Sequence, residues 1–412
     1  MKKVLLTLLT LFAVGGVWAQ STADVSGADN AVYAVGGTYV IGQDIALPIY
    51  IKNNINAQAT TFVVTLQEGL EFVENSKDET AISAELSNAD SDHTIMSNIA
   101  NGMFAVFSAT NSELPEDMVV LHLKTASDVT PGEYTITIHD LNMSNADNGK
   151  EVKSDASFVS TIYLSDYLVL DENSTTAPEA MENVNVLVKR TIKAGNWGTI
   201  CLPFAMTGDQ VKEAFGSDVE LADFEGYETE KNADEEIVGI NVKFNSIDVT
   251  SGLQANHPCI IKVGETVNEF SVDGVTIEPE DEPTVAAVKR TKKQWSELIG
   301  TYVANTVVGN AEEDSWMLYL ANNKFYYSKG TAKMKAFRAY FDFYDVLADF
   351  ENAAKIGFYV DGDATSIDGI GTQRVVEGVY DLSGRKIQLE GNDLNKLQKG
   401  VYIIDGKKVT IK

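Results

Sequence analysis

Hydrophobic and polar residues alternate over short segments along most of the chain, and turn residues separate these segments. Residues 134–138, for example, read Tyr-Thr-Ile-Thr-Ile directly after the turn pair Pro131-Gly132. Asn101-Gly102 has the composition of a tight hairpin turn. A period of two residues, with turns spaced by roughly 8–12 residues, is typical of β-sandwiches. The pattern therefore predicts an all-β protein.

The pattern also divides the chain. Residues 20–166 and 183–365 both have the texture of a β-sandwich, and we predict tandem sandwich domains there. Residues 167–182 are acidic, small and contain proline, which is typical of a linker. The last stretch, 366–412, contains two short hairpin patterns rich in lysine, and we predict a small C-terminal β-sandwich.

One segment breaks the period of two and predicts a short helix at 208–215. Thr207 and Gln210 have the spacing of a capping box, in which each side chain bonds the other residue's backbone. Val211 and Phe215 then lie on one apolar face, and Gly216 is suited to end the helix.

Composition excludes several functions. The 412 residues include 60 Asp or Glu and 32 Lys or Arg, for a net charge of −28. This argues against nucleic acid as a partner, because nucleic-acid binding needs a basic surface. Four histidines in separate segments leave little material for a zinc site or for histidine-based catalysis.

The first 19 residues predict a secretory signal peptide. Lys2 and Lys3 precede an apolar stretch at 4–14, and Val17 and Ala19 suit a cleavage site. No later run approaches the roughly 18 apolar residues of a transmembrane helix. We therefore expect an exported protein.

Export places Cys201 and Cys259 in an oxidising compartment, where a disulfide could form between them. The alternative is two buried free thiols, since the geometry is not visible in the sequence. We favour the disulfide.

The C-terminal stretch resembles the type A sorting domains of the type IX secretion system. The resemblance lies in residues 379–387 (Val-Tyr-Asp-Leu-Ser-Gly-Arg-Lys-Ile), 397–404 and 407–409. It implies Gram-negative export, contact with the secretion machinery, and a destination at the cell surface (outer membrane) or outside the cell. The residues that would carry this role are Gly384, Arg385, Gly400, Tyr402, Lys407 and Lys408.

The N-terminal region resembles cohesin-like, Ig-like surface sandwiches at the level of pattern. The resemblance lies in residues 35–38, 45–51, 58–66, 68–72 and 129–134. Cohesins bind dockerins, so the resemblance implies a protein partner. The middle region resembles a recurrent module of exported proteins from the same secretion setting, through residues 195–204 and 336–341.

Two groups of residues are candidates for ligand binding. Asp361, Asp363 and Asp368 offer alternating oxygen ligands, as calcium loops do, although a turn between domains explains them as well. The aromatic residues Trp295, Trp316 and Tyr319 could stack on sugar rings, with core packing as the alternative. Calcium is the one cofactor for which the sequence offers candidate ligands. We expect no other cofactor.

No catalytic motif is present: neither G-x-S-x-G nor H-E-x-x-H occurs. We therefore expect no enzyme and assign no catalytic residue. The prediction is a secreted or surface binding and adhesion protein of a Gram-negative bacterium that recognises protein or glycan. The alternatives are an extracellular glycosidase or peptidase and a structural, self-associating surface protein.

Overall fold

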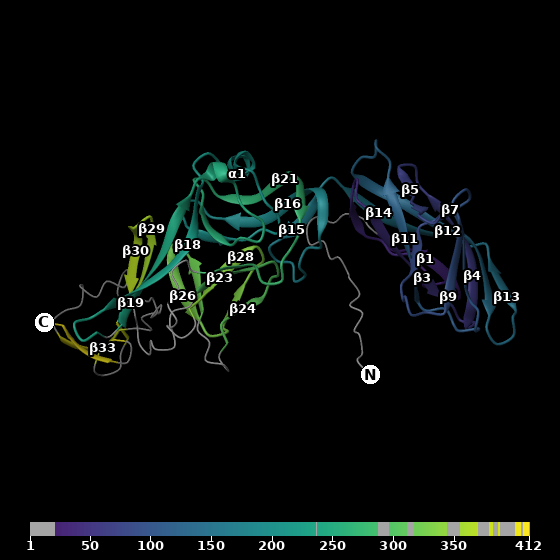
Figure 1. Ribbon diagram of the computed structural model, residues 1–412. Coiled ribbons are helices and arrows are strands. Elements are labelled where there is room, and N and C mark those ends of the chain that lie inside the picture. Colours follow the sequence, from purple (N-terminus) through teal and green to yellow (C-terminus); the bar gives the residue numbers. More distant parts are fainter. Residues whose placement is uncertain are drawn as a thin grey trace.

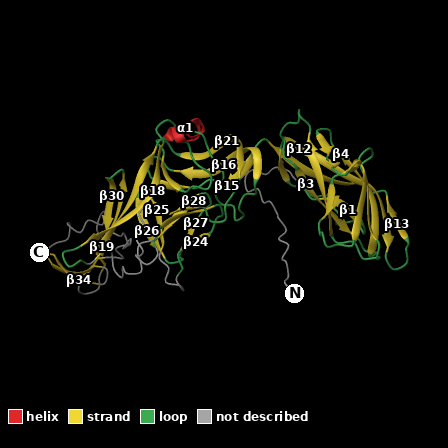
Figure 2. Cartoon of the chain, in the orientation of Figure 1, coloured by secondary structure: helices red, strands yellow, loops and turns green. Residues whose placement is uncertain are grey.

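The computed structural model describes residues 21–235, 237–286, 296–310, 317–343 and 355–369, together with strands between 379 and 411. The chain is 57% strand and 3% helix. This confirms the all-β fold class (Figures 1 and 2). Among the described residues, no helix is long and apolar enough to cross a membrane.

Two sheets face each other in the N-terminal part, which we call the N-terminal sandwich. One sheet contains, in order, β1 (Ala31–Ala34), β3 (Ile45–Lys52), β11 (Asp117–Thr125) and β5 (Leu70–Phe72), with β8 (Ala84–Leu86) also paired to β11. The other contains β2 (Thr38–Val40), β14 (Phe158–Ser165), β12 (Gly132–Asn145), β4 (Ala57–Leu66), β10 (Met103–Ser108) and β9 (His93–Asn98), with β13 (Glu151–Ser154) also paired to β12. A small hairpin joins β6 (Glu74–Asn75) to β7 (Asp78–Ile82).

Alternating sequence explains this sandwich. In β3 the buried residues are Ile45, Leu47, Ile49 and Ile51, with more exposed residues between them. They belong to the first core, which is formed by buried residues between Ala23 and Leu164.

Strand β12 contains a β-bulge that changes which residues of the strand are buried. Ile138 and Leu141 are both buried although they are three residues apart. The register against β4 shifts after His139, and Asp140 has a positive φ of 54°. This bulge inserts one extra residue, so the side chains that follow it return to the core.

Three further sheets form the second region, which begins at β15. The first contains β15 (Leu168–Asp171), β16 (Met181–Ile192) and β21 (Val267–Ile277). The second contains β17 (Gly198–Ile200), β20 (Cys259–Lys262), β18 (Glu220–Lys231), β19 (Ile237–Ile247), β29 (Lys355–Val360) and β30 (Asp363–Gly369). The third contains β22 (Thr284–Ala286), β23 (Glu297–Thr301), β28 (Arg338–Asp342), β25 (Met317–Ala321) and β26 (Lys324–Ser328), and a separate pair joins β24 (Thr306–Val308) to β27 (Ala332–Met334).

The predicted helix is present as α1 (Gly208–Phe215), with the short 3-10 helix η1 (Val249–Ser251) nearby. Both bonds of the capping box between Thr207 and Gln210 are formed. Phe215 packs on Phe270 of β21 with ring centroids 4.7 Å apart. The sequence prediction is confirmed here because the capping signals are local.

Two buried clusters fill the second region. We call one the second core, formed by Val40 and buried residues from Leu170 to Phe337. The other is the third core, which is mainly aromatic. At its centre, Phe341 has Phe224, Phe325 and Phe244 within 5.9 Å, mostly edge to face.

The C-terminal strands are β31 (Val379–Asp381), β32 (Lys386–Ile387), β33 (Gly400–Ile404) and β34 (Lys407–Ile411), in the order β32-β31-β33-β34. They form the two hairpins that the sequence pattern predicts in this stretch. In Figure 1 they lie at the opposite end of the molecule from the N-terminal sandwich.

The stretch predicted as a linker, 167–182, is partly built into the second region, while residues 173–180 form no strand and are mostly exposed. It contains β15, which pairs with β16 in parallel, and the buried Glu172, only 7% exposed. Met181 already belongs to β16. Its small, acidic composition suggested a solvated connector, but its residues pair with partners far away in the sequence.

Candidate functional site

Three adjacent strands of the N-terminal sandwich contain no charged residue. These are β4, β10 and β9, which have no Lys, Arg, Asp or Glu. Strands β2 and β14 of the same sheet also lack charged residues, so the exposed Met96 and Met103 are what distinguish the face formed by β4, β10 and β9. We call it the uncharged face and define it by outward-facing side chains of β4, β9, β10 and β12: Thr61, Val63, Thr65, Thr94, Met96, Asn98, Met103, Ala105 and His139.

The strand register places these side chains in rows. Met103 lies opposite Asn98 on one side and Val63 on the other, and Val63 lies opposite His139. In the next row, Ala105 lies between Met96 and Thr61. Four strands at about 4.8 Å spacing give a row roughly 14 Å wide.

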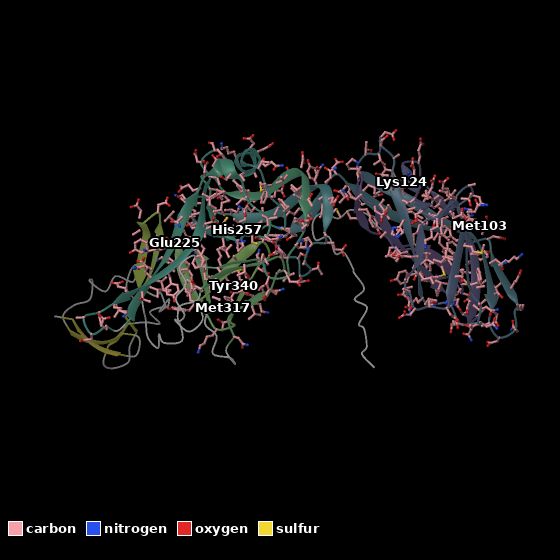
Figure 3. The ribbon with its side chains drawn as sticks, in the orientation of Figure 1. Met103, Lys124, Glu225, His257, Met317 and Tyr340 are labelled. Atoms are coloured by element: carbon pink, nitrogen blue, oxygen red, sulfur yellow. The ribbon has the colours of Figure 1, made fainter. Side chains whose placement is uncertain are left out.

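The two methionines dominate this face. Met96 is 61% exposed and Met103 is 43% exposed, on neighbouring strands (Figure 3 labels Met103). Large apolar side chains gathered on one sheet face are typical of a surface that contacts another molecule. The uncharged face is therefore our candidate functional site.

The polar atoms of His139 are used within the sandwich. Its Nε2 lies 2.9 Å from the Thr65 hydroxyl, and its Nδ1 lies 3.1 Å from the Asp140 carboxylate. These contacts fix the ring on the sheet and leave hydroxyl, thioether and methyl groups as the main chemistry of the face.

Acidic residues stand at the margin of the uncharged face. Asp92 directly precedes β9, and its carboxylate accepts hydrogen bonds from the hydroxyls of Thr110, Ser112 and Ser108. These bonds lower the pKa of Asp92, which stays ionised at neutral pH. Asp92 and Asp140 therefore place negative charge at two points on the margin of this face.

The four histidines lie in separate strands or loops, each beside a carboxylate. Each of the four lies within ion-pair distance of an aspartate, as expected in so acidic a chain. The pairs are His93 with Asp92 at 3.3 Å, His122 with Asp44 at 2.8 Å, His139 with Asp140 at 3.1 Å, and His257 with Asp223 at 2.6 Å.

One of these pairs has the residue types of a catalytic triad without its geometry. The Ser91 hydroxyl lies 2.6 Å from Nδ1 of His93, and the Asp92 carboxylate lies 3.3 Å from the same nitrogen. In a triad the serine and the aspartate bind opposite ring nitrogens. Here Nε2 instead faces the Ser112 carbonyl at 3.3 Å, so the histidine cannot relay a proton between them.

The predicted sugar-stacking residues are only partly described. Trp295 and Trp316 lie outside the described residues. Tyr319 is on the outer side of β25, where its ring stacks on that of Tyr326 at a centroid distance of 5.4 Å. Because Tyr326 covers one ring face, Tyr319 offers less stacking surface than an isolated aromatic residue.

The predicted disulfide is not formed. Cys201 and Cys259 are both free and both buried. In the pairing of β17 with β20, Cys259 lies opposite Ile200, so Cys201 is one residue out of register. Burial raises the pKa of Cys201 to about 12 and also raises that of Cys259, which keeps both thiols protonated and unreactive.

Of the three calcium candidates, the side chains of Asp361 and Asp363 are described, whereas Asp368 is described only as backbone. The Asp361 carboxylate accepts hydrogen bonds from the backbone N–H and the hydroxyl of Ser246, at 2.8 and 2.5 Å. Asp363 opens β30, and Asp368 lies five residues further along that strand. Among the described residues, no group of three or more His, Cys, Asp or Glu side chains could hold a metal ion. Asp361 instead closes the turn between β29 and β30.

The predicted sorting residues cannot be placed as side chains. Gly384 and Arg385 lie outside the described residues, and only the backbone is described for Gly400, Tyr402, Lys407 and Lys408. Sequence reasoning, in turn, missed Met96 and Met103. The signal that could have indicated this face is the lack of charged residues in the three separate segments that form β4, β9 and β10.

Comparison with known proteins gives a partial likeness. No protein-family model and no curated protein matches the chain. A cohesin of Clostridium thermocellum, from a type I cohesin–dockerin complex, is 14% identical with a TM-score of 0.25, over 33% of this chain and 99% of that one. A non-cellulosomal cohesin from the archaeon Archaeoglobus fulgidus is 13% identical with a TM-score of 0.23, over 34% and 92%. The cohesin module of a family 33 glycoside hydrolase from Clostridium perfringens is 9% identical with a TM-score of 0.26, over 35% and 99%. At TM-scores of 0.23 to 0.26, none of these likenesses assigns a family or a function to this chain.

Proposed function

We propose that this protein is a non-enzymatic, exported binding protein that recognises a protein partner through the uncharged face. The observation that carries the proposal is the absence of charge from three adjacent strands, with Met96 and Met103 exposed among them. Because Met96 and Met103 are already partly buried, covering the rest of each side chain would contribute less than the roughly 1.5–3 kcal/mol of a fully exposed methionine. Thioether side chains also adapt to the shape of a partner.

Charge indicates the kind of partner. The chain carries a net charge of −28, and Asp92 and Asp140 border the uncharged face. An acidic partner would be repelled at this margin. We therefore propose a protein surface with an apolar, uncharged centre and basic groups around it.

Met96→Asp is expected to weaken partner binding at least about 30-fold, or about 2 kcal/mol, because the new carboxylate would be desolvated beneath the partner. The partner is first identified by placing a photo-reactive amino acid at position 96 in the bacterium that makes the protein. Mass spectrometry then identifies the cross-linked product, and the purified partner is titrated against wild type and variant.

Val307→Asp is the matched control, since Val307 is 50% exposed on β24, outside the N-terminal sandwich. This variant should bind as wild type does. Equal losses in both variants, or no discrete product from position 96, would contradict the proposal. A product that is a glycan would assign the face to carbohydrate instead.

We also propose that the C-terminal stretch, 366–412, directs the protein to the cell surface. The support is its sequence resemblance to type IX sorting domains, at residues that include Gly384, Gly400 and Lys407. Deleting 366–412 is expected to abolish surface or extracellular localisation, as measured by fractionation and intact mass. Unchanged localisation would reduce this stretch to an ordinary β-structure.

A further inference from the structure

Two consecutive residues at the end of β2 belong to two different cores. Val40 is 8% exposed and lies in the second core, with residues such as Leu170 and Val184. Ile41, the next residue, packs against the first core of the N-terminal sandwich. The turn that follows β2 therefore has one side chain in each half of the molecule.

The turn is firmly held on its own side. Strand β2 pairs with β14 in parallel, and the Ile41 N–H donates to the Ser165 carbonyl at 2.9 Å. Gly42 has a φ of 82°, and its N–H donates to the Thr125 hydroxyl at 3.0 Å. The turn moves with the N-terminal sandwich because these bonds connect it to β14 and β11.

The turn is also held on the other side. The Gln43 side-chain amide donates to the carbonyls of Glu182 and Asn183, at 3.0 and 3.3 Å. These carbonyls lie in β16 at a register shift against β21, where Asn183 has a φ of 48°. Gln43 thus satisfies acceptors at an irregular point of the second region's sheet.

The covalent connection between the two halves is short and folded. Only Asp166 and Tyr167 lie between β14 and β15. The Ser165 hydroxyl donates to the Tyr167 carbonyl at 2.8 Å and accepts from the Tyr167 N–H at 3.1 Å. Leu168 then packs against the second core. The connection has no slack that would let the halves separate without breaking these contacts.

We propose that residues 40–43 act as a latch that holds the N-terminal sandwich on the second region in one orientation. The latch makes the two halves move as one body. The uncharged face is then presented at a fixed angle rather than on a swinging domain. The proposal rests on these contacts alone and does not depend on what the uncharged face binds.

The test breaks the latch in the full chain with Val40→Asp combined with Gln43→Ala. Small-angle X-ray scattering should show a broader distance distribution and a larger maximum dimension than wild type. Chymotrypsin should cleave after Tyr167 at least about tenfold faster, because local opening exposes this bond. Val159→Asp is the control, since Val159 is 48% exposed on β14, and it should leave both measurements unchanged.

Near-UV circular dichroism and the thermal midpoint show whether the double variant stays folded. A folded double variant with wild-type scattering and wild-type cleavage would overturn the proposal. Should the double variant fail to fold, Gln43→Ala alone decides, because it removes only the two bonds to Glu182 and Asn183. Faster cleavage in this variant supports the latch, and unchanged cleavage overturns it.

Discussion

Arg190→Lys is expected to lower the free energy of unfolding by about 3 kcal/mol. Arg190 is 1% exposed, and its two terminal nitrogens donate to the carbonyls of Phe337 and Thr199. Lysine keeps the burial cost of a positive charge, but its compact ammonium cannot bridge both carbonyls as the planar guanidinium does. A hydrogen bond to a charged group contributes roughly 1.5–3 kcal/mol, and lysine loses at least one of the two.

The Phe337 carbonyl explains why the arginine matters. Phe337 is buried with a φ of 60°, a conformation that is costly for an aromatic residue. Its carbonyl also accepts from the Cys201 N–H at 3.2 Å, and its own N–H donates to the Thr301 carbonyl at 2.7 Å. Arg190 therefore joins β16, β17 and the start of β28 around one strained residue.

Urea unfolding followed by tryptophan fluorescence measures this effect selectively. Three of the four tryptophans, Trp197, Trp295 and Trp316, lie beyond residue 182. Arg338→Lys is the matched control, because Arg338 is 28% exposed and a lysine there can still pair with Glu172. We expect it to cost less than about 1 kcal/mol. Equal losses of unfolding free energy in Arg190→Lys and Arg338→Lys would show that the buried guanidinium of Arg190 adds no particular stability.

Local features of the fold could be predicted from the sequence. Alternation in β3 needs only a strand with one buried face, and the capping box of α1 needs only residues three apart. Both follow from the geometry of a single element, so tertiary contacts did not overrule them.

Features that depend on distant partners could not be predicted. Glu172 was assigned to a linker, yet its carboxylate binds Lys335 and Arg338, more than 160 residues away. The disulfide failed because the strand pairing places Ile200, rather than Cys201, opposite Cys259. The sequence of one strand alone does not determine which residues of its partner strand lie opposite it.

The uncharged face could be predicted from the sequence only in part. That β4, β9 and β10 lack charge is visible in the sequence. That they are neighbours is not, because β4 precedes β9 and β10 by a long stretch, yet pairs directly with β10. Only the sheet order turns three unremarkable segments into one surface.

Glu172→Gln is expected to lower the free energy of unfolding by about 3 kcal/mol at neutral pH. The Glu172 carboxylate is nearly buried and accepts hydrogen bonds from Lys335, at 2.7 Å, and from Arg338. Its backbone is bound as well, since its N–H donates to Lys189 and its carbonyl accepts from Ala336. Removing the charge leaves the partly buried Arg338 without its counter-ion, and breaking such a pair typically costs several kcal/mol.

The pH dependence separates this charge effect from simple loss of packing. Burial raises the pKa of Glu172, but the hydrogen bonds and charges of Lys335 and Arg338 more than offset it, so the pKa lies below its ordinary value of 4.5. A carboxyl group whose pKa is lowered by folding stabilises the protein above its ordinary pKa. That stabilisation is lost as the pH falls through the lowered, folded-state pKa.

The difference between wild type and Glu172→Gln should therefore be largest from pH 5 to 7 and should shrink as the pH falls below about 4. Urea unfolding at pH 7, 5, 4 and 3 measures it. Asp361→Asn is a useful comparison, because the pKa of Asp361 is also lowered, by hydrogen bonds from Ser246, but at an exposed site. Its effect should be much smaller. A difference for Glu172→Gln that stays constant down to pH 3 would mean that the side chain stabilises the fold by its shape and not by its charge.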